Sequence, residues 1–391
     1  MHSKHVSLFG GKMRGSLYEL NFLLNLAIAV IAFYLSVFAS SIGIKEFYLG
    51  LMYSAGSALS ILALTQVTKI IEFVSVKKAL LLSSILYCVS LFLIAFSTTF
   101  THLLLAYAIM SIALIYTVCI LDMYVSENSE HNHNTGKVRG VFLAVSNIAY
   151  VVGPFIGGIL VQIGGFSALY LAAAAFLMPF IAIVYERMPN IRSLSHVHSH
   201  SLKKSLLKVW RTPQLREVFI AQSTYRKFIA TFNVYAALYL TQIAGLSFFE
   251  LGIVLTFFII PYVIVEFPLG KMLDSNWSER TPALIGFFIM ALCASIIPSI
   301  ATSVLAFWCI IFFILGIGGG LVELSLESYF FKHIHASNEE AVAAFRALYP
   351  MSYLLGPITG SVLFYWGGYE LLFFILVCML LYGAKTAYTF E

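Results

Sequence analysis

The chain has 391 residues, of which 60% are hydrophobic and 10% are charged, and its mean hydropathy is +0.92. Because an average soluble domain is roughly 25% charged, this composition excludes an ordinary soluble protein and indicates a chain embedded in a lipid bilayer. The net charge of +5 is explained below by membrane topology and gives no support to nucleic-acid binding.

Long apolar runs follow one another from residue 18 to the C-terminal region. A helix that crosses a bilayer core about 30 Å thick needs roughly 20 residues, and the only other structure that spans a bilayer is a closed β-barrel. The apolar runs here are about twice as long as a barrel strand, so they predict helices. We therefore expect an all-α membrane protein with twelve transmembrane helices. The expected ranges are 18–41, 47–70, 79–97, 101–123, 139–163, 167–186, 216–243, 248–271, 281–300, 303–329, 341–364 and 370–388.

Lysine and arginine are distributed unevenly between the two sides of these helices. With the N-terminus inside, only Lys45 falls outside, and Arg226, Lys227 and Arg346 fall within helices. The remainder of the 23 basic residues lie on or near the inner side. The positive-inside rule then predicts a multi-pass protein of the plasma (inner) membrane with both termini in the cytoplasm.

Two related halves are indicated by a polar interval and by repeated motifs. GIKEFYLG (43–50) and GLSFFELG (245–252) open the second and eighth helices with an offset of 202 residues. We expect an N-terminal six-helix bundle at 1–186, a cytoplasmic linker at 187–215 and a C-terminal six-helix bundle at 216–391.

Glycine and proline also recur at matching places, in GPFIGGILVQIGG (153–165) and GPITGSVLFYWGG (356–368). Small residues let helices approach closely in lipid, and proline bends a helix by removing one backbone hydrogen bond. These stretches therefore predict packing hinges. The hinge residues are Gly153, Pro154, Gly157 and Gly158 in the first copy, and Gly356, Pro357 and Gly360 in the second.

An acidic residue lies 22 residues beyond the last glycine of each opening motif. The later one is within GKMLDSNWSER (270–280), which resembles the signature G-x-L-x-D-x-x-G-x-R/K of the major facilitator superfamily, found between the second and third helices of each half. Gly270 and Asp274 match, Met272 replaces the leucine, Trp277 replaces the second glycine, and Arg280 comes one residue late.

The first copy of this loop departs from the signature in other ways. In EFVSVKK (72–78), Glu72 is the acid and Lys77 is in register, while Ser75 replaces the second glycine and Thr68 the first. The resemblance implies two pseudo-twofold-related six-helix bundles. It also implies a gating role for the loop groups Asp274, Gly270, Arg280, Glu72, Lys77 and Lys78.

The fifth helix resembles a second signature of the superfamily. AYVVGPFIGG (149–158) is similar to G-x-x-x-G-P-x-x-G-G, which is associated with exporters and antiporters, with Ala149 in place of the first glycine. This resemblance favours efflux, although a general hinge would also explain why Gly-Pro recurs in the eleventh helix.

Ionisable groups within transmembrane helices are energetically costly and mark candidate sites. Opposite charges occupy neighbouring layers of the second half, and Lys227 matches Asn25 at the offset of 202. Since repeat-built transporters place their sites between the repeats, we expect a central cavity with polar residues from both halves. The candidates are Glu323, Arg226, Lys227, Glu266, Asn25 and Asn21.

Glu323 is predicted to be a protonatable switch whose pairing with Arg226 or Lys227 changes with conformation. Two alternatives stay open: a permanent ion pair that supports the bundle, and direct binding of an anionic substrate by the cations. Arg226 and Lys227 differ by about 100° around their helix, so they cannot both point straight into one cavity. A further set is predicted to form a cytoplasmic latch, namely Asp122, Arg139, Glu327 and Arg346.

Histidines are clustered in predicted cytoplasmic loops, at His131/His133, His196/His198/His200 and His333/His335. No cysteine accompanies them, so a solvated loop is favoured over metal binding. The five cysteines form no CxxC pair and are interpreted as packing residues. We expect neither a metal nor a cofactor.

No nucleophile elbow, phosphate-binding glycine loop or HExxH motif is present, so we do not expect an enzyme. We expect a secondary active transporter that works as a monomer in the lipid bilayer. It would move a small-molecule substrate by alternating access, as proton-coupled efflux. Two other functions remain open: a proton symporter or uniporter for a polar or anionic nutrient, and a transporter-like sensor that no longer cycles.

Overall fold

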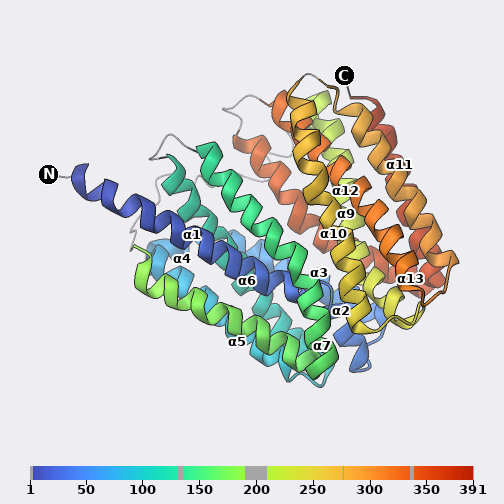
Figure 1. Ribbon diagram of the computed structural model, residues 1–391, viewed down its shortest axis with the longest axis horizontal. Helices are drawn as coiled ribbons and strands as arrows, with labels where there is room; N and C mark the ends of the chain where they lie inside the picture. The colour runs from blue at the N-terminus through green and yellow to red at the C-terminus, as the bar shows by residue number, and fades with distance from the viewer. Residues whose placement is uncertain (1–2, 131–134, 190–208, 276, 335–338, 391) are drawn as a thin grey trace. The chain divides into compact units, whose positions relative to one another are not determined.

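The computed structural model describes residues 3–130, 135–189, 209–275, 277–334 and 339–390. Within these ranges the regular elements are helices, as expected for an all-α membrane protein (Figure 1). They are α1 (Ser3–Ile31), α2 (Leu35–Ser41), α3 (Glu46–Leu64), α4 (Val67–Val74), α5 (Val76–Ala95), α6 (Phe100–Glu130), α7 (Thr135–Arg187), α9 (Pro213–Gln242), α10 (Phe248–Asp274), α11 (Arg280–Ile296), the short 3-10 helix η1 (Ile297–Ser299), α12 (Leu305–His333) and α13 (Glu339–Tyr388).

Two of these helices contain sharp breaks in the backbone. Each break lies where the sequence predicts the end of one transmembrane helix and the start of the next. In α7 the backbone leaves helical geometry at Gly165, where φ is 69°, and in α13 it does so at Gly367 and Gly368, where φ of Gly368 is 61°. Only glycine adopts such positive φ angles without steric strain. The fifth and sixth expected helices therefore correspond to the two parts of α7, and the eleventh and twelfth to those of α13.

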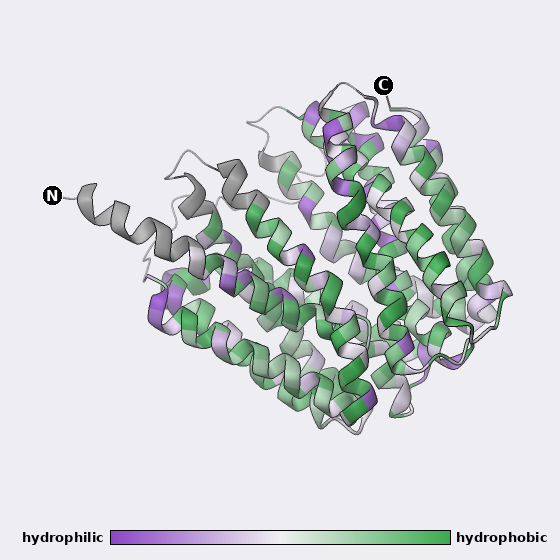
Figure 2. Cartoon of the chain, in the orientation of Figure 1, coloured by the Kyte–Doolittle hydropathy of each residue, from purple (hydrophilic) through white to green (hydrophobic). Residues whose placement is uncertain are grey.

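Helix composition is consistent with twelve membrane crossings. Among the described residues, nine helical segments are long and apolar enough to cross a membrane, and two of these are 47 and 45 residues long and contain the breaks just described. The charged helix α9 is not among them. In Figure 2, hydrophobic residues cover the middle of the spans and hydrophilic residues gather toward helix ends.

The chain divides into two compact units. Unit 1 comprises residues 1–42 and 55–197, and unit 2 comprises residues 43–54 and 198–391. The start of α3 thus belongs with unit 2, which the expected boundary at residue 186 does not anticipate. Most of the expected linker, residues 190–208, lies outside the described residues, so the predicted domain limits stay predictions.

Three helix pairings recur in the two units. In unit 1, α1 packs along α7, and α5 packs against both α6 and α7. In unit 2, α9 packs along α13, and α11 packs against both α12 and α13. This correspondence is what a duplicated six-helix arrangement requires.

The glycines of the two repeated Gly-Pro stretches lie where two of these helix pairs pack closely. A methyl group on Gly157 would lie 2.5 Å from the Val30 carbonyl oxygen of α1, and one on Gly360 would lie 2.7 Å from the Tyr235 ring of α9. The Tyr34 hydroxyl donates a hydrogen bond to the Pro154 carbonyl, with an O–O distance of 2.7 Å. These small residues bring the helices together, as expected in lipid, while a hinge motion at them stays a prediction.

Candidate functional site

An ion-pair cluster connects α9 and α12 within unit 2. The Arg226 guanidinium lies between two carboxylates, with Nη2 2.8 Å from Glu323 Oε1 and 3.3 Å from Glu327 Oε1. Glu323 and Glu327 are one helical turn apart, so both face the same side of α12. The side chains of Arg226 and Glu323 are 19% and 28% exposed, so this pair is largely withdrawn from the surface.

Tyrosines complete the surroundings of Glu323. The buried Tyr225 hydroxyl donates to Glu323 Oε2 at 2.9 Å and lies 3.3 Å from the Tyr262 hydroxyl of α10. Both carboxylate oxygens of Glu323 therefore have partners, one cationic and one neutral. Gly319 leaves space for Tyr262, because a methyl group there would overlap the tyrosine hydroxyl.

Aromatic rings also hold the Arg226 side chain. Its guanidinium carbon lies 5.6 Å from the Tyr225 ring centroid and 5.7 Å from that of Tyr349 on α13. Contacts of this length are attractive cation–π interactions. Arg226 is therefore fixed by groups from α9, α12 and α13 together.

Acidic and basic side chains gather around Glu327. Glu323, Glu266, Arg226 and Arg346 all interact with it electrostatically, and Glu266 and Arg346 are exposed side chains. This group of five contains three carboxylates and two guanidinium groups. Within it, Glu323 and Glu327 share the Arg226 guanidinium.

Lys227 differs from its neighbour Arg226. Its side chain is half-buried, and among the described residues no hydrogen bond or ion pair engages it. Arg226 and Lys227 therefore have separate surroundings, in keeping with their different directions around the helix.

Asn21 and Asn25 tie α1 to α7 in unit 1. The Asn21 amide donates to the Phe142 carbonyl and the Ser146 hydroxyl, each at 2.7 Å. The Asn25 amide donates to the Asn21 side-chain oxygen at 2.7 Å. These hydrogen bonds support helix packing, and a role of the two residues in a substrate cavity stays a prediction.

The loop between α10 and α11 is held in place by Glu279, a residue that the sequence analysis does not predict to be functional. The Lys332 ammonium of α12 lies 2.6 Å from Glu279 Oε1 and donates to the Leu273 carbonyl, and the Ser328 hydroxyl donates to Glu279 at 3.0 Å. Burial raises the pKa of Glu279, but the hydrogen bonds from Lys332, its own backbone amide and Ser328, with the Lys332 charge, outweigh burial and hold it below its ordinary value.

The cations of the two signature loops occupy corresponding places. Lys77 donates to the Tyr185 carbonyl at 2.7 Å and lies 5.8 Å from the Tyr185 ring centroid. The Arg280 guanidinium lies 3.9 Å from the Tyr388 ring centroid. Both cations and both tyrosines are related by the same offset of 203 residues. Each loop is thus anchored to the end of its own unit's last helix.

The remaining gating candidates contribute fewer contacts. Glu72, Lys78 and Asp122 are exposed, and Gly270 has open space beside it. Asp274 is the last residue of α10, but its side chain and that of Arg139 lie outside the described residues. Glu327 joins the Arg226 cluster, so the gate and the latch stay predictions.

Ser75, which takes the place of the second signature glycine, has an unusual backbone. Its φ and ψ are 79° and 155°, and it is the single non-glycine residue with positive φ among those described. This region is essentially limited to glycine and carries strain of about 1–3 kcal/mol. The family's preference for glycine at this position therefore has a direct conformational reason.

Replacing Ser75 with glycine is expected to stabilise the protein by about 1 kcal/mol, because relief of strain exceeds the added entropy of the unfolded chain. The measurement is thermal unfolding in detergent. Ser75→Ala is the matched control, since it keeps both the Cβ and the strain. Equal melting temperatures for the two variants would contradict this explanation.

The structure describes all five cysteines but only part of the histidine clusters. His131, His133, His196, His198, His200 and His335 lie outside the described residues. His333 packs on Tyr329 at a ring distance of 4.0 Å. All five cysteines are free thiols.

Comparisons with known proteins identify the family. A family model described as Major Facilitator Superfamily matches residues 20–232 and 218–388. Among solved structures, the nucleoside transporter NupG superposes with a TM-score of 0.76 and 14% identity, covering 97% of this chain and 100% of that chain. A bacterial homolog of the human lysosomal transporter Spinster gives 0.75 and 12%, covering 97% and 96%.

Two further relatives broaden the comparison. The human organic anion transporter MFSD10 (TETRAN) gives a TM-score of 0.66 and 13% identity, covering 97% of this chain and 99% of that chain. The multidrug efflux pump Tap of Mycolicibacterium fortuitum is 34% identical over 88 residues, 21% of this chain and 22% of Tap. The chain thus matches about a fifth of the length of this curated relative.

The structural similarities share the fold at low sequence identity, and the family match spans nearly the whole chain. Together they confirm the resemblance indicated by the loop and helix motifs. This chain therefore belongs to the Major Facilitator Superfamily, whose members are membrane transporters of small molecules.

Proposed function

We propose that this protein is a proton-coupled efflux transporter in which Glu323 takes up and releases the proton. The observation that carries this proposal is the shared position of Arg226, which pairs with both Glu323 and Glu327. When two carboxylates share one guanidinium group, the carboxylate that loses it has a natural place for one proton.

In this proposal, movement of Arg226 between Glu323 and Glu327 couples proton binding to the conformational change. While Arg226 pairs with Glu323, the carboxylate is ionised and Tyr225 donates to it. When Arg226 moves toward Glu327, Glu323 loses its cation, and an unpaired carboxylate in low-dielectric surroundings is favoured in the protonated form. The Tyr225 hydroxyl can accept from the protonated acid as readily as it donates to the ion. Loss and recovery of the Arg226 contact thus bind and release a proton.

The efflux direction is supported by two sequence similarities. The fifth-helix Gly-Pro stretch resembles the exporter signature, and one partial relative is a multidrug efflux pump. In this proposal the substrate crosses by alternating access between bundles at 1–186 and 216–391. The signature loops act as gates, and the protein works as a monomer in a plasma membrane with cytoplasmic termini.

The test is Glu323→Gln in proteoliposomes. We expect this variant to lose transport driven by a pH gradient while keeping exchange of substrate for substrate, because glutamine preserves the shape and hydrogen bonding of the site but binds no proton. Glu186→Gln, at an exposed position of α7, is the matched control and should retain both activities. Unchanged pH-driven transport in Glu323→Gln would rule out Glu323 as the proton carrier.

A second candidate is transport of an anionic substrate, favoured by Lys227, which has no ion-pair partner within the described ranges. A half-buried ammonium on a membrane helix can bind a carboxylate or phosphate. Counterflow against a panel of dyes, drugs, sugars and carboxylates distinguishes the two candidates. Selective uptake of carboxylates would favour the second.

A further inference from the structure

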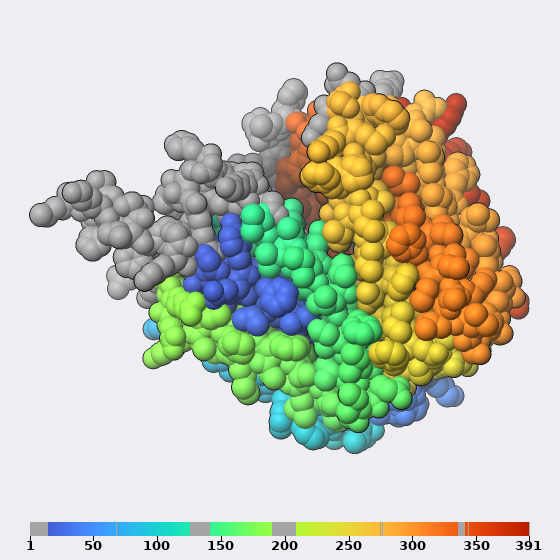
Figure 3. Space-filling model, viewed as in Figure 1, coloured from blue at the N-terminus to red at the C-terminus, as the bar shows by residue number. Residues whose placement is uncertain are grey.

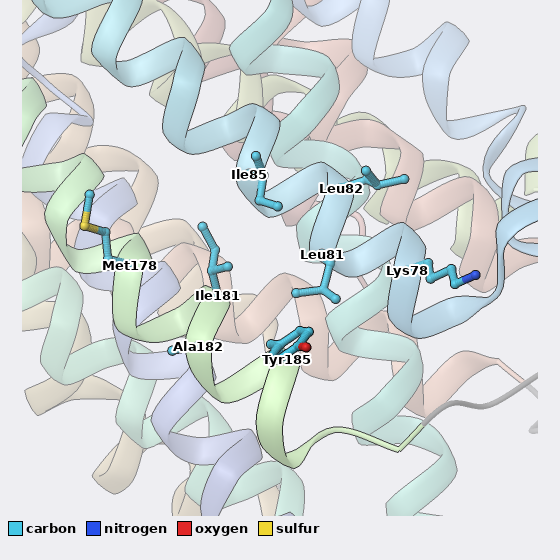
Figure 4. Close-up of a pocket in the computed structure, with 8 residues that line it drawn as sticks. All are labelled: Lys78, Leu81, Leu82, Ile85, Met178, Ile181, Ala182 and Tyr185. Carbon is cyan, nitrogen blue, oxygen red and sulfur yellow. The ribbon is translucent and has the colours of Figure 1, made fainter.

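An apolar groove runs between α5 and α7 in unit 1 (Figure 4). Its cavity volume is about 600 Å³, within the range of roughly 300–1,000 Å³ typical of small-ligand sites. The walls are formed by Leu81, Leu82 and Ile85 of α5 and by Met178, Ile181 and Ala182 of α7. Lys78 and Tyr185 lie at one end, as Figure 4 shows.

The groove opens on a surface that lies in the membrane. It is formed by two helical segments that are apolar and long enough to cross a bilayer. Leu82 and Met178 are 59% and 65% exposed. Apolar side chains exposed on a membrane span face acyl chains, so the groove is filled from the lipid phase rather than from water.

The length of the groove fits one leaflet. Lys78 and Ile85, like Met178 and Tyr185, are seven residues apart in sequence, which is about 10 Å along a helix. One leaflet is about 15 Å thick, half of the ~30 Å hydrocarbon core. Lys78 belongs to the end that the distribution of basic residues predicts to be cytoplasmic. The groove therefore extends from the predicted cytoplasmic interface into the cytoplasmic leaflet.

The Lys78 ammonium, at the predicted cytoplasmic end of the groove, is available to bind a ligand. Lys78 is exposed and forms no ion pair within the described part of the chain. Its basic neighbours are engaged, since Lys77 donates to the Tyr185 carbonyl and Arg187 pairs with Glu19 at 2.9 Å. The exposed Tyr185 ring adds an amphipathic group of the kind that anchors proteins at the lipid headgroups.

We propose that this groove binds one acyl chain of an anionic phospholipid from the cytoplasmic leaflet, with the headgroup phosphate on Lys78. Apolar walls accept the chain, and the ammonium at the interface favours a lipid with net negative charge over a zwitterionic one. The groove is formed by residues of unit 1 and the Arg226 cluster by residues of unit 2, so the two sites share no residue. The test of the groove therefore does not depend on the proposed proton coupling.

The test uses the full chain in nanodiscs containing equal amounts of phosphatidylglycerol and phosphatidylcholine, with retained lipid measured by native mass spectrometry. We expect the wild-type protein to retain phosphatidylglycerol severalfold in preference to phosphatidylcholine. Lys78→Gln should abolish the preference, and Lys78→Arg should keep it. Lys69→Gln makes the same charge change at an exposed position of α4 outside the groove and should leave the preference intact.

A second pair of variants tests the apolar walls. Ala182→Trp fills the groove and should remove the retained lipid, whereas Ala175→Trp, seven residues earlier on α7 and outside the lining, should not. The proposal is overturned if Lys78→Gln and Lys69→Gln behave alike, or if Ala182→Trp retains as much lipid as the wild type. It is also overturned if the wild-type groove retains an uncharged apolar dye in place of phosphatidylglycerol.

Discussion

Arg226→Met is expected to destabilise the protein by about 3 kcal/mol and to abolish transport, because it leaves the Glu323 and Glu327 carboxylates without their shared cation. Methionine keeps much of the side-chain length and packs adaptably, so the loss reports the charge and not a cavity. The measurements are thermal unfolding in detergent and uptake into proteoliposomes.

Two further variants separate the charge effect from general damage. Arg226→Lys keeps the charge but cannot reproduce the guanidinium contacts with two carboxylates and two rings, so an intermediate stability is expected. Arg226→Met combined with Glu323→Gln should recover part of the lost stability, because the carboxylate left unpaired is removed as well. If the double variant is less stable than Arg226→Met alone, charge compensation is not the function of this pair.

Gly316→Ala is expected to lower the free energy of unfolding by about 2 kcal/mol, because overpacking displaces backbone where two helices meet. A methyl group at this position of α12 would overlap the Phe258 carbonyl oxygen of α10 and lie 3.1 Å from Pro261 Cγ. In Figure 3 the gold column of α10 and the orange column of α12 stand side by side in unit 2, with no space between them.

The matched control for this glycine is Gly15→Ala on α1, where nothing lies within 4 Å of the added methyl group. That change should be neutral or stabilising by up to about 1 kcal/mol, since alanine favours a helix more than glycine does. The melting temperature of Gly316→Ala is therefore expected to fall clearly below that of Gly15→Ala. Equal melting temperatures would show that the α10–α12 contact adjusts freely.

Much of the fold follows from short-range sequence patterns. Apolar runs of about 20 residues predict membrane helices because the bilayer fixes their length, and the offset of 202–203 residues predicts matching halves. The backbone breaks at Gly165 and Gly368 are consistent with the predicted ends of spans. The assignment of the start of α3 to unit 2 could not be predicted, because it depends on contacts such as that of the Gly50 amide with Ser361.

The candidate site was only partly accessible from sequence. Opposite charges in neighbouring membrane layers indicate Arg226, Lys227, Glu323 and Glu266, since charges in lipid require partners. The pairing of Glu327 with Arg226 does not follow from this pattern, which assigns Glu327 to the latch, and it comes from the structure. Tyr225 and Tyr262 gave no such signal, because the chain contains 22 tyrosines, uncharged and widespread.

Glu279 was missed for a different reason. It occupies a variable position of the signature loop, and its partners Lys332 and Ser328 lie about fifty residues later in the chain. An acid beside the signature and a lysine at the end of a later helix are the only sequence signals for the pair Glu279 and Lys332. Their contact depends on the fold.

The glycine turns within α7 and α13 affect how the chain enters the membrane. At Gly165 and at Gly367–Gly368 the backbone reverses within one or two residues, so almost no polar loop has to be carried across the bilayer between the helices on either side. An isolated span must position its two ends separately, but helices joined this closely satisfy their backbone groups and partition into lipid together. We therefore expect each of these pairs to enter the membrane as a single hairpin during biosynthesis.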